Sequence, residues 1–143
     1  METHHHPTIV VIEDNPSDVM LLRVGLNQHP REYEMRVLSD GAEAMEFCEE
    51  CGNDGEAKPC VMVLDLPKYD GRAVLREIRG NPALAHVRVV VWTTIASSSE
   101  EREICELGVR LYRAKPLRLD EWITLAGEIL DICEEHLKPV KPD

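Results

Sequence analysis

The stretch IVVIEDNPSD, residues 9–18, joins the end of a predicted strand to the start of a predicted helix. Ile9 to Ile12 form a short apolar run of β-branched residues, which is typical of a strand. Asn15 and Pro16 then supply a capping residue and a proline at the first helical position, a pattern that begins helices. Because Glu13 and Asp14 lie between the two, the stretch indicates a strand followed by a helix, with acidic side chains at the carboxyl end of the strand.

The same alternation recurs along the rest of the chain. Further β-type runs lie at residues 33–38, 61–64, 87–92 and 111–112, and each gap has room for one helix. Strands that alternate with helices, with continuously apolar middle strands, favour a parallel sheet covered on both faces. With right-handed crossovers, the sequence predicts an α/β fold that is a doubly wound three-layer sandwich.

Each predicted helix carries an apolar stripe. The helices are expected from Asn15 to before Pro30, over 41–51, from 71 to 80, from a capping box at Ser98-x-x-Glu101, and over 119–137. The positions expected to face the core are, in chain order, Val19, Leu22 and Leu26, then Ala42, Met45 and Cys48, then Val74, Leu75 and Ile78, then Ile104 and Leu107, and finally Trp122, Leu125, Ile129 and Ile132.

Length and charge limit the classes of function. The chain has 143 residues, which corresponds to one domain, and we expect residues 8–137 to form it, with flexible ends at 1–7 and 138–143. Sixteen Lys and Arg against 27 Asp and Glu give a net charge of −11, which argues against direct binding to nucleic acid or to a membrane. Without a signal peptide or an apolar run of the roughly 18–20 residues that a membrane span needs, the sequence predicts a cytoplasmic protein.

The five cysteines, at positions 48, 51, 60, 105 and 133, are an odd number at irregular spacing. We expect them to be reduced. The pair Cys48-x-x-Cys51 falls at the end of a predicted helix, whereas a reactive pair needs the start of one, where the helix dipole lowers the thiol pKa. With no second pair to complete a zinc site, the pattern favours small buried residues over redox or zinc chemistry.

Polar side chains follow four of the predicted strands. Glu13 and Asp14 follow the first strand, Asp65 the third, Thr93 the fourth and Lys115 the fifth. Working residues of such sheets lie just past the carboxyl ends of the strands, so we expect these five in one crevice. Gathered carboxylates repel one another and favour a hard divalent cation with oxygen ligands, which we expect to be Mg²⁺.

This set of groups suits phosphoryl transfer. An aspartate carboxylate can attack phosphorus, and a cation, an ammonium and a hydroxyl can stabilise the charge on the transferring oxygens. Each signal is weak alone, since acids after a strand often cap a helix and a threonine there often bonds nearby backbone. Their joint occurrence at the ends of the correct strands favours a shared site.

The chain resembles the receiver domain of two-component response regulators over residues 7–136. The matching stretches are VVIEDNPSD at 10–18, VMVLD at 61–65, PKYDG at 67–71, VVVWTT at 89–94 and LYRAKP at 111–116. The resemblance implies a flavodoxin-like (βα)5 sandwich with a five-stranded parallel sheet in the order 2-1-3-4-5. It also implies a phospho-acceptor signalling protein rather than an enzyme that turns over a free substrate.

The resemblance implies roles for the residues at the strand ends. Asp65 would accept a phosphoryl group from a sensor histidine kinase, Glu13 and Asp14 would hold Mg²⁺ together with Asp65, and Lys115 would contact the phosphoryl group. The stretches IEDNPSD and NPALAHVRVVVWTT and the single-domain length are similar to regulators that serve bacterial phytochromes. A bacteriophytochrome is therefore a candidate for the kinase.

Signalling in this family implies a changed protein-binding surface. Thr93 would turn toward the phosphoryl oxygen, and Tyr112 resembles the aromatic residue that moves with it. The equilibrium of the fourth helix, fifth strand and fifth helix would shift as a result. The fifth strand and helix of such folds also form isologous contacts, so a homodimer through these three elements is a further expectation.

Three departures from the family pattern keep alternatives open. Family members place the proline four residues after the acceptor aspartate, whereas Asp65-Leu66-Pro67 advances two, so a degenerate receiver that binds its partner without phosphorylation is the alternative. Ile95 stands where a polar residue often assists dephosphorylation, which predicts slow loss of the phosphoryl group. Trp92 is bulkier than the usual aliphatic residue and either fills the core or crowds the switch. A small phosphohydrolase is less favoured, because Pro67 lies where such enzymes often carry a second acid.

Overall fold

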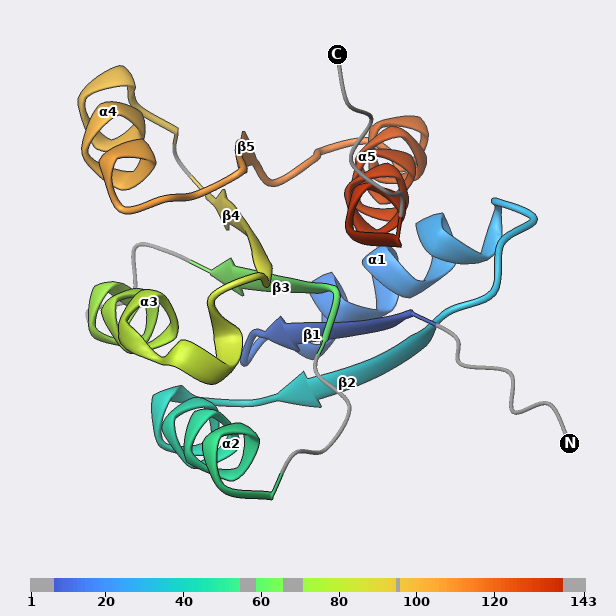
Figure 1. Ribbon diagram of the computed structural model, residues 1–143. Helices are drawn as coiled ribbons and strands as arrows, with labels where there is room; N and C mark the ends of the chain where they lie inside the picture. Colours follow the sequence, from blue (N-terminus) through green and yellow to red (C-terminus); the bar gives the residue numbers. More distant parts are fainter. Residues whose placement is uncertain (1–6, 55–58, 66–70, 95, 138–143) are drawn as a thin grey trace, which may run out of the picture.

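The computed structural model describes residues 7–54, 59–65, 71–94 and 96–137, and these residues form a five-stranded parallel sheet with helices on both faces (Figure 1). The strand order is β2-β1-β3-β4-β5, which confirms the predicted doubly wound fold and its 2-1-3-4-5 order. The elements in chain order are β1 (Thr8–Ile12), α1 (Pro16–Asn27), β2 (Glu34–Leu38), α2 (Gly41–Asp54), β3 (Val61–Asp65), α3 (Gly71–Gly80), the short 3₁₀ helix η1 (Pro82–Leu84), β4 (Arg88–Thr93), α4 (Ser98–Glu106), β5 (Leu111–Ala114) and α5 (Leu119–Leu137).

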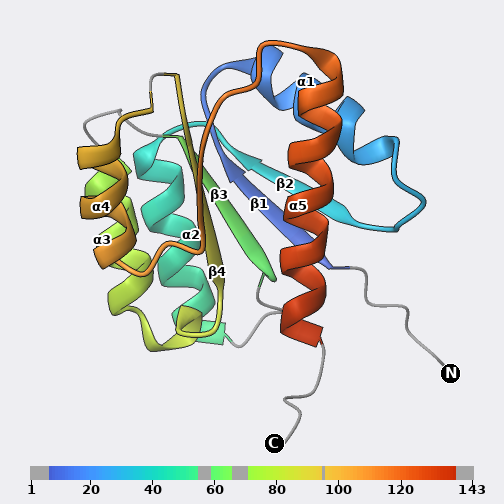
Figure 2. The ribbon, with the colours of Figure 1, turned by 90° about the horizontal axis from the view of Figure 1, so that it is seen from above.

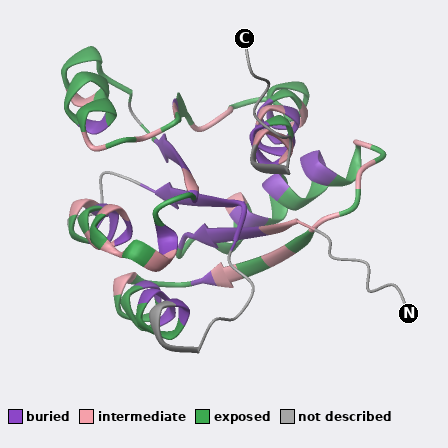
Figure 3. Cartoon of the chain, viewed as in Figure 1, coloured by how far each residue is buried: buried purple, intermediate pink, exposed green. Residues whose placement is uncertain are grey.

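The sheet separates two hydrophobic cores. Helices α1 and α5 cover one face, and α2, α3 and α4 cover the other (Figures 1 and 2). Strands β1, β3 and β4 are buried along nearly their whole length, whereas the edge strand β2 alternates between exposed and half-buried positions before its buried last residue (Figure 3). Continuously apolar strands thus lie in the centre of the sheet, where helices exclude water from both faces.

Four of the five predicted helical stripes face the core as expected, with Leu107 only half-buried just beyond the end of α4. The exception is α2, where Ala42 and Met45 are exposed and Cys48 alone of the predicted set is buried. The buried positions are Ala44, Phe47, Cys48 and Cys51, which follow the i, i+3, i+4, i+7 spacing of one helix face. The prediction was wrong because its stripe left out Phe47, the largest apolar side chain of this helix.

The start of α4 also differs from the prediction. The N-cap is Ser97 rather than Ser98, and the Glu100 backbone N–H donates to Ser97 Oγ at 3.1 Å. The capping position is therefore shifted by one residue, in a run of three serines where each could serve.

Cys60 and Cys133 form a disulfide, so the expectation of reduced cysteines is wrong for this pair. Cys60 directly precedes β3 and Cys133 lies near the end of α5, 73 residues later in the chain. The packing of α5 on the sheet brings their Cα atoms to 5.2 Å, within the usual range for a disulfide. Cys48 and Cys105 are free thiols, and Cys51 takes no part in this disulfide.

Trp92 belongs to the core. Its side chain is fully buried and meets Trp122 of α5 edge to face, with ring centroids 5.5 Å apart. In the described part of the chain, no helix is long and apolar enough to cross a lipid bilayer.

Candidate functional site

The predicted site residues lie at the carboxyl end of the sheet. Glu13 and Asp14 follow β1, Asp65 and Thr93 are the last residues of β3 and β4, and Lys115 follows β5. Because β1, β3, β4 and β5 are parallel neighbours, their ends meet at one edge. Residues 66–70, including Pro67, and Ile95 lie outside the described residues. The expectations that depend on Pro67 and Ile95 therefore stay predictions.

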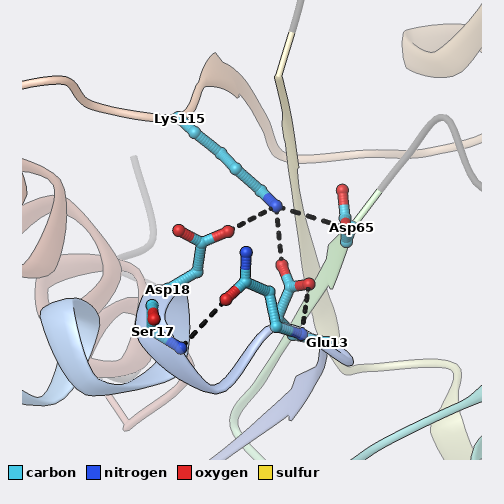
Figure 4. Close-up of polar contacts among 6 residues, drawn as sticks. Glu13, Ser17, Asp18, Asp65 and Lys115 are labelled. Carbon is cyan, nitrogen blue, oxygen red and sulfur yellow. Dashed lines mark hydrogen bonds and ion pairs between the residues drawn. The ribbon is translucent and has the colours of Figure 1, made fainter.

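Lys115 is the centre of the polar contacts at this edge (Figure 4). Its Nζ lies 2.9 Å from Glu13 Oε1, 2.8 Å from Asp18 Oδ2 and 3.3 Å from Asp65 Oδ2. Burial alone would lower the pKa of Lys115, but hydrogen bonds to Asp18 and Glu13 and the charges of the carboxylates outweigh burial and raise the pKa above its usual value. The Lys115 side chain therefore stays protonated and positively charged at neutral pH.

Glu13 is a buried carboxylate beside another carboxylate. Burial is the main reason why the pKa of Glu13 is raised to about 7; the hydrogen bond with Lys115 lowers it, and the neighbouring charge of Asp65 raises it further. The backbone N–H of Asn15 donates to Glu13 Oε2 at 3.1 Å, which fixes the side chain next to the start of α1. Such a group gains from a further positive charge placed near it.

The three acids fit a divalent cation. One oxygen each of Glu13, Asp14 and Asp65 lies within 4.8 Å of the others, so all three can reach a single ion. Asp65 Oδ1 is buried and accepts no hydrogen bond from the described residues, which leaves a buried lone pair for a ligand. Hard oxygen donors are the ligands that Mg²⁺ and Mn²⁺ prefer.

Thr93 and Tyr112 lie on the side of the sheet that faces α3 and α4. Thr93 is fully buried and its carbonyl accepts the Lys115 backbone N–H at 2.7 Å. Tyr112 is buried in the core, and its hydroxyl donates to Glu100 and accepts the Ser97 backbone N–H at 3.3 Å. The structure therefore connects Tyr112 with the start of α4.

Asp18 is a site residue that the sequence reasoning missed. It lies in the first turn of α1, and its carboxylate makes the shortest contact of Lys115 Nζ. The available signal was an acidic residue one helical turn after the Glu13-Asp14 pair. Sequence alone does not show toward which strand end that turn points.

This arrangement can support transfer of a phosphoryl group to a carboxylate. Asp65 offers the oxygen nucleophile, the acidic cluster can hold a cation, and Lys115 supplies a fixed ammonium. These groups surround the place where negative charge would develop on the transferring oxygens.

Comparison with known proteins agrees with this geometry. Residues 9–126 match the family described as the response regulator receiver domain. The chain is 34% identical over 123 residues to the response regulator Rcp1 of Synechocystis sp., covering 84% of each chain.

Two solved structures have the same fold. The phosphorylated cyanobacterial phytochrome response regulator RcpA superposes with a TM-score of 0.78 at 30% identity, covering 97% of this chain and all of that one. The Mn²⁺-bound form of Rcp1 gives a TM-score of 0.75 at 30% identity, covering 96% of this chain and 99% of the other.

Proposed function

Because the chain belongs to the response regulator receiver domain family, we propose that it accepts a phosphoryl group on Asp65 from a sensor histidine kinase. The observation that carries this proposal is the convergence of Asp65, the acidic cluster and Lys115 Nζ, with a buried Asp65 oxygen left without a hydrogen bond from the described residues. An exposed acidic turn would not have this environment.

In the proposed reaction, an oxygen of the Asp65 carboxylate forms a bond to phosphorus while the bond from phosphorus to the donor breaks. The electron pair of that bond stays on the donor, which is the kinase histidine or, for acetyl phosphate, the departing acetate. Lys115 is placed to donate a hydrogen bond to a phosphoryl oxygen, because its Nζ already lies 3.3 Å from Asp65. The Thr93 hydroxyl is the second donor, with Tyr112 following its movement.

Glu13, Asp14 and Asp65 are proposed to hold Mg²⁺. When bound, the cation would neutralise charge on the carboxylates and on the phosphoryl oxygens. Rcp1 has been solved in a Mn²⁺-bound form, which supports the binding of a divalent cation by this chain. The choice of Mg²⁺ follows from the all-oxygen donor set.

The test is intact-mass spectrometry after incubation with acetyl phosphate, with Mg²⁺ or with a chelator. We expect the wild type to gain one phosphoryl unit only with Mg²⁺, and Asp65→Asn to gain none. Asp131→Asn is a matched control, because it removes the same charge from an exposed residue paired with Arg31. Labelling of Asp65→Asn would contradict the site, and an unlabelled wild type would favour the constitutive binder. Slow loss of the phosphoryl group stays a prediction, because it depends on Ile95, which lies outside the described residues.

The same proposal includes the partners. RcpA is named as a phytochrome response regulator, which supports a phytochrome-type histidine kinase as the phosphoryl donor. The exchange would take place in the cytoplasm, where ATP supplies histidine kinases, and the chain itself would turn over no free substrate.

A homodimer through α4, β5 and α5 is a second part of the proposal. Acidic residues on the outer side of α5 are paired with arginines from other parts of the chain, as in Arg113 with Glu128, Arg31 with Asp131 and Arg110 with Glu135. These pairs reduce the charge repulsion that two copies of the helix would otherwise experience. Light scattering on phosphorylated and unphosphorylated protein tests the proposal, and monomers in both states would contradict it.

A further inference from the structure

Lys115 contacts three carboxylates, and these differ in whether they can also bind a cation. Its ammonium donates hydrogen bonds to Asp18 and Asp65 and forms an ion pair with Glu13. Glu13 and Asp65 belong to the cluster that can hold a cation, whereas Asp18 does not. Among these three partners, Asp18 alone would keep its contact with Lys115 undisturbed when a cation binds to the other two.

We propose that Asp18 is a positioning residue that anchors the Lys115 ammonium beside Asp65 while Glu13 and Asp65 face the cation. The inference rests on the proposed function, because that function gives Lys115 its role toward the phosphoryl group. Asp18 itself touches neither Asp65 nor the phosphoryl group in this scheme and acts through the lysine.

The reason is competition between two positive charges for the same oxygens. A cation held by Glu13 and Asp65 would repel the ammonium and would compete with it for the same carboxylate oxygens. Lys115 would then lean away from the site unless another anion held it. Asp18 Oδ2, at 2.8 Å from Nζ, is that anion.

The surroundings of Asp18 and Lys115 make this anchor rigid. Asp18 lies in the first turn of α1, where its backbone N–H donates to the Asn15 carbonyl at 3.1 Å, and the next residue, Val19, is buried in the core. On the other side, the Lys115 backbone N–H is fixed to Thr93, and its ammonium lies 5.6 Å from the centre of the Trp92 ring. The side chain of Asp18 is 18% exposed, so water screens the pair only in part.

A simpler role for Asp18 is stabilisation of α1. An acidic residue in the first turn interacts favourably with the helix dipole. In that case its removal would change the stability of the helix and leave the reactivity of Lys115 unchanged. The experiment therefore needs a readout on the lysine itself.

The first arm measures acetylation of Lys115 by brief pulses of acetic anhydride, quantified on the Lys115 peptide, with Mg²⁺ present. We expect Asp18→Ala to raise the labelling rate of Lys115 about tenfold, because a charge-assisted hydrogen bond is lost. Asp18→Asn keeps a hydrogen-bond acceptor without the negative charge. Its Lys115 labelling rate should therefore lie between those of the wild type and Asp18→Ala. Asp131→Asn, which breaks an exposed pair with Arg31, should label like the wild type.

The second arm measures the rate of phosphorylation by acetyl phosphate at saturating Mg²⁺. We expect Asp18→Ala to lower this rate about tenfold, as loss of a partner that orients a working residue usually does, and Asp18→Glu to restore part of it. Equal Lys115 labelling in wild type and Asp18→Ala overturns the proposal, and so does increased labelling without a change in rate. A wild type that accepts no phosphoryl group contradicts the proposed function, but the acetylation arm still decides whether Asp18 holds Lys115.

Discussion

Glu13 shows how strongly the site depends on added positive charge. Glu13, Asp18 and Asp65 surround one ammonium, and Asp14 lies beside them. One lysine cannot balance this many partly buried carboxylates, and the raised pKa of Glu13, about 7, reflects burial first and the charge of Asp65 after it. A divalent cation would relieve both effects at once.

At the same scale, the free thiols should differ sharply in reactivity. Burial, and after it the neighbouring Cys51 and Glu77, raises the pKa of Cys48 to about 11, whereas Cys105 is exposed. At pH 8 only roughly one thousandth of Cys48 would be thiolate, which is the reactive form. We expect iodoacetamide to alkylate Cys105 in the native protein and to leave Cys48 unmodified, as measured by peptide mapping.

Cys105→Ala is the control for this prediction, since it should remove the fast alkylation and leave the fold unchanged. Rapid native labelling of Cys48 would show that α2 does not bury this thiol. The result also bears on Cys48-x-x-Cys51, because a redox pair needs an accessible thiolate.

The residues that the sequence located are those fixed by strand ends. Glu13, Asp65 and Lys115 converge because parallel neighbouring strands end at one edge, and this follows from strand assignment alone. Asp18 and the Cys60–Cys133 disulfide could not be located in this way. They depend on how a helix is rotated and where it lies on the sheet, which a single sequence does not specify.

At the scale of elements, α1 and α5 are the most extensively packed pair of helices in the described part of the chain, and they lie on the same face of the sheet (Figure 2). Gly25 of α1 makes this approach feasible, because a Cβ there would lie 2.6 Å from the Trp122 carbonyl oxygen and 3.2 Å from the Ala126 Cβ. The helices therefore need a glycine at this position in order to pack backbone against backbone.

We predict that Gly25→Ala lowers the free energy of unfolding by about 1–3 kcal/mol, the usual cost of overpacking. This loss would come in spite of the roughly 1 kcal/mol by which alanine favours a helix over glycine. Gly80→Ala is the matched control, because a Cβ at Gly80 meets nothing within 4 Å. It should be neutral or stabilising by up to about 1 kcal/mol. Urea denaturation measures both, and a Gly25→Ala midpoint at or above the wild-type value would contradict the close packing.

The helices also show how far apolar periodicity can predict which face is buried. Periodicity alone placed the buried faces of α1, α3 and α5, although α1 also carries exposed apolar side chains at Met20, Leu21 and Val24. In α2, two overlapping stripes were available, and packing chose the one that contains Phe47, whose ring also receives the Arg36 guanidinium at 4.8 Å. Tertiary packing determines which of the two stripes is buried, and the spacing of apolar residues along the helix does not show it.

At the scale of the whole molecule, the two faces of the sheet differ in how their helices are tied. On one face, α5 is joined to the start of β3 by the Cys60–Cys133 disulfide and packs closely on α1. On the other face, α4 is connected to β5 through the side-chain hydrogen bond from Tyr112 to Glu100. Because α4 is held by non-covalent contacts, which include ion pairs of Arg72 with Glu100 and Glu103, we expect the proposed phosphorylation of Asp65 to displace α4 more readily than α1.

The disulfide should contribute to the stability of the whole molecule through the unfolded chain. It closes a loop of 73 residues, and in the chain-entropy model a loop of this length corresponds to about 4 kcal/mol. We expect a reductant to lower the free energy of unfolding by up to this amount, measured by urea denaturation with and without reductant. Cys60→Ala should show the lower stability and no response to reductant, whereas Cys105→Ala should keep the full response because Cys105 is a free, exposed thiol. Equal midpoints in both conditions, together with five titratable thiols in the unreduced, denatured protein, would show that Cys60 and Cys133 remain reduced and that packing alone holds α5 on the sheet.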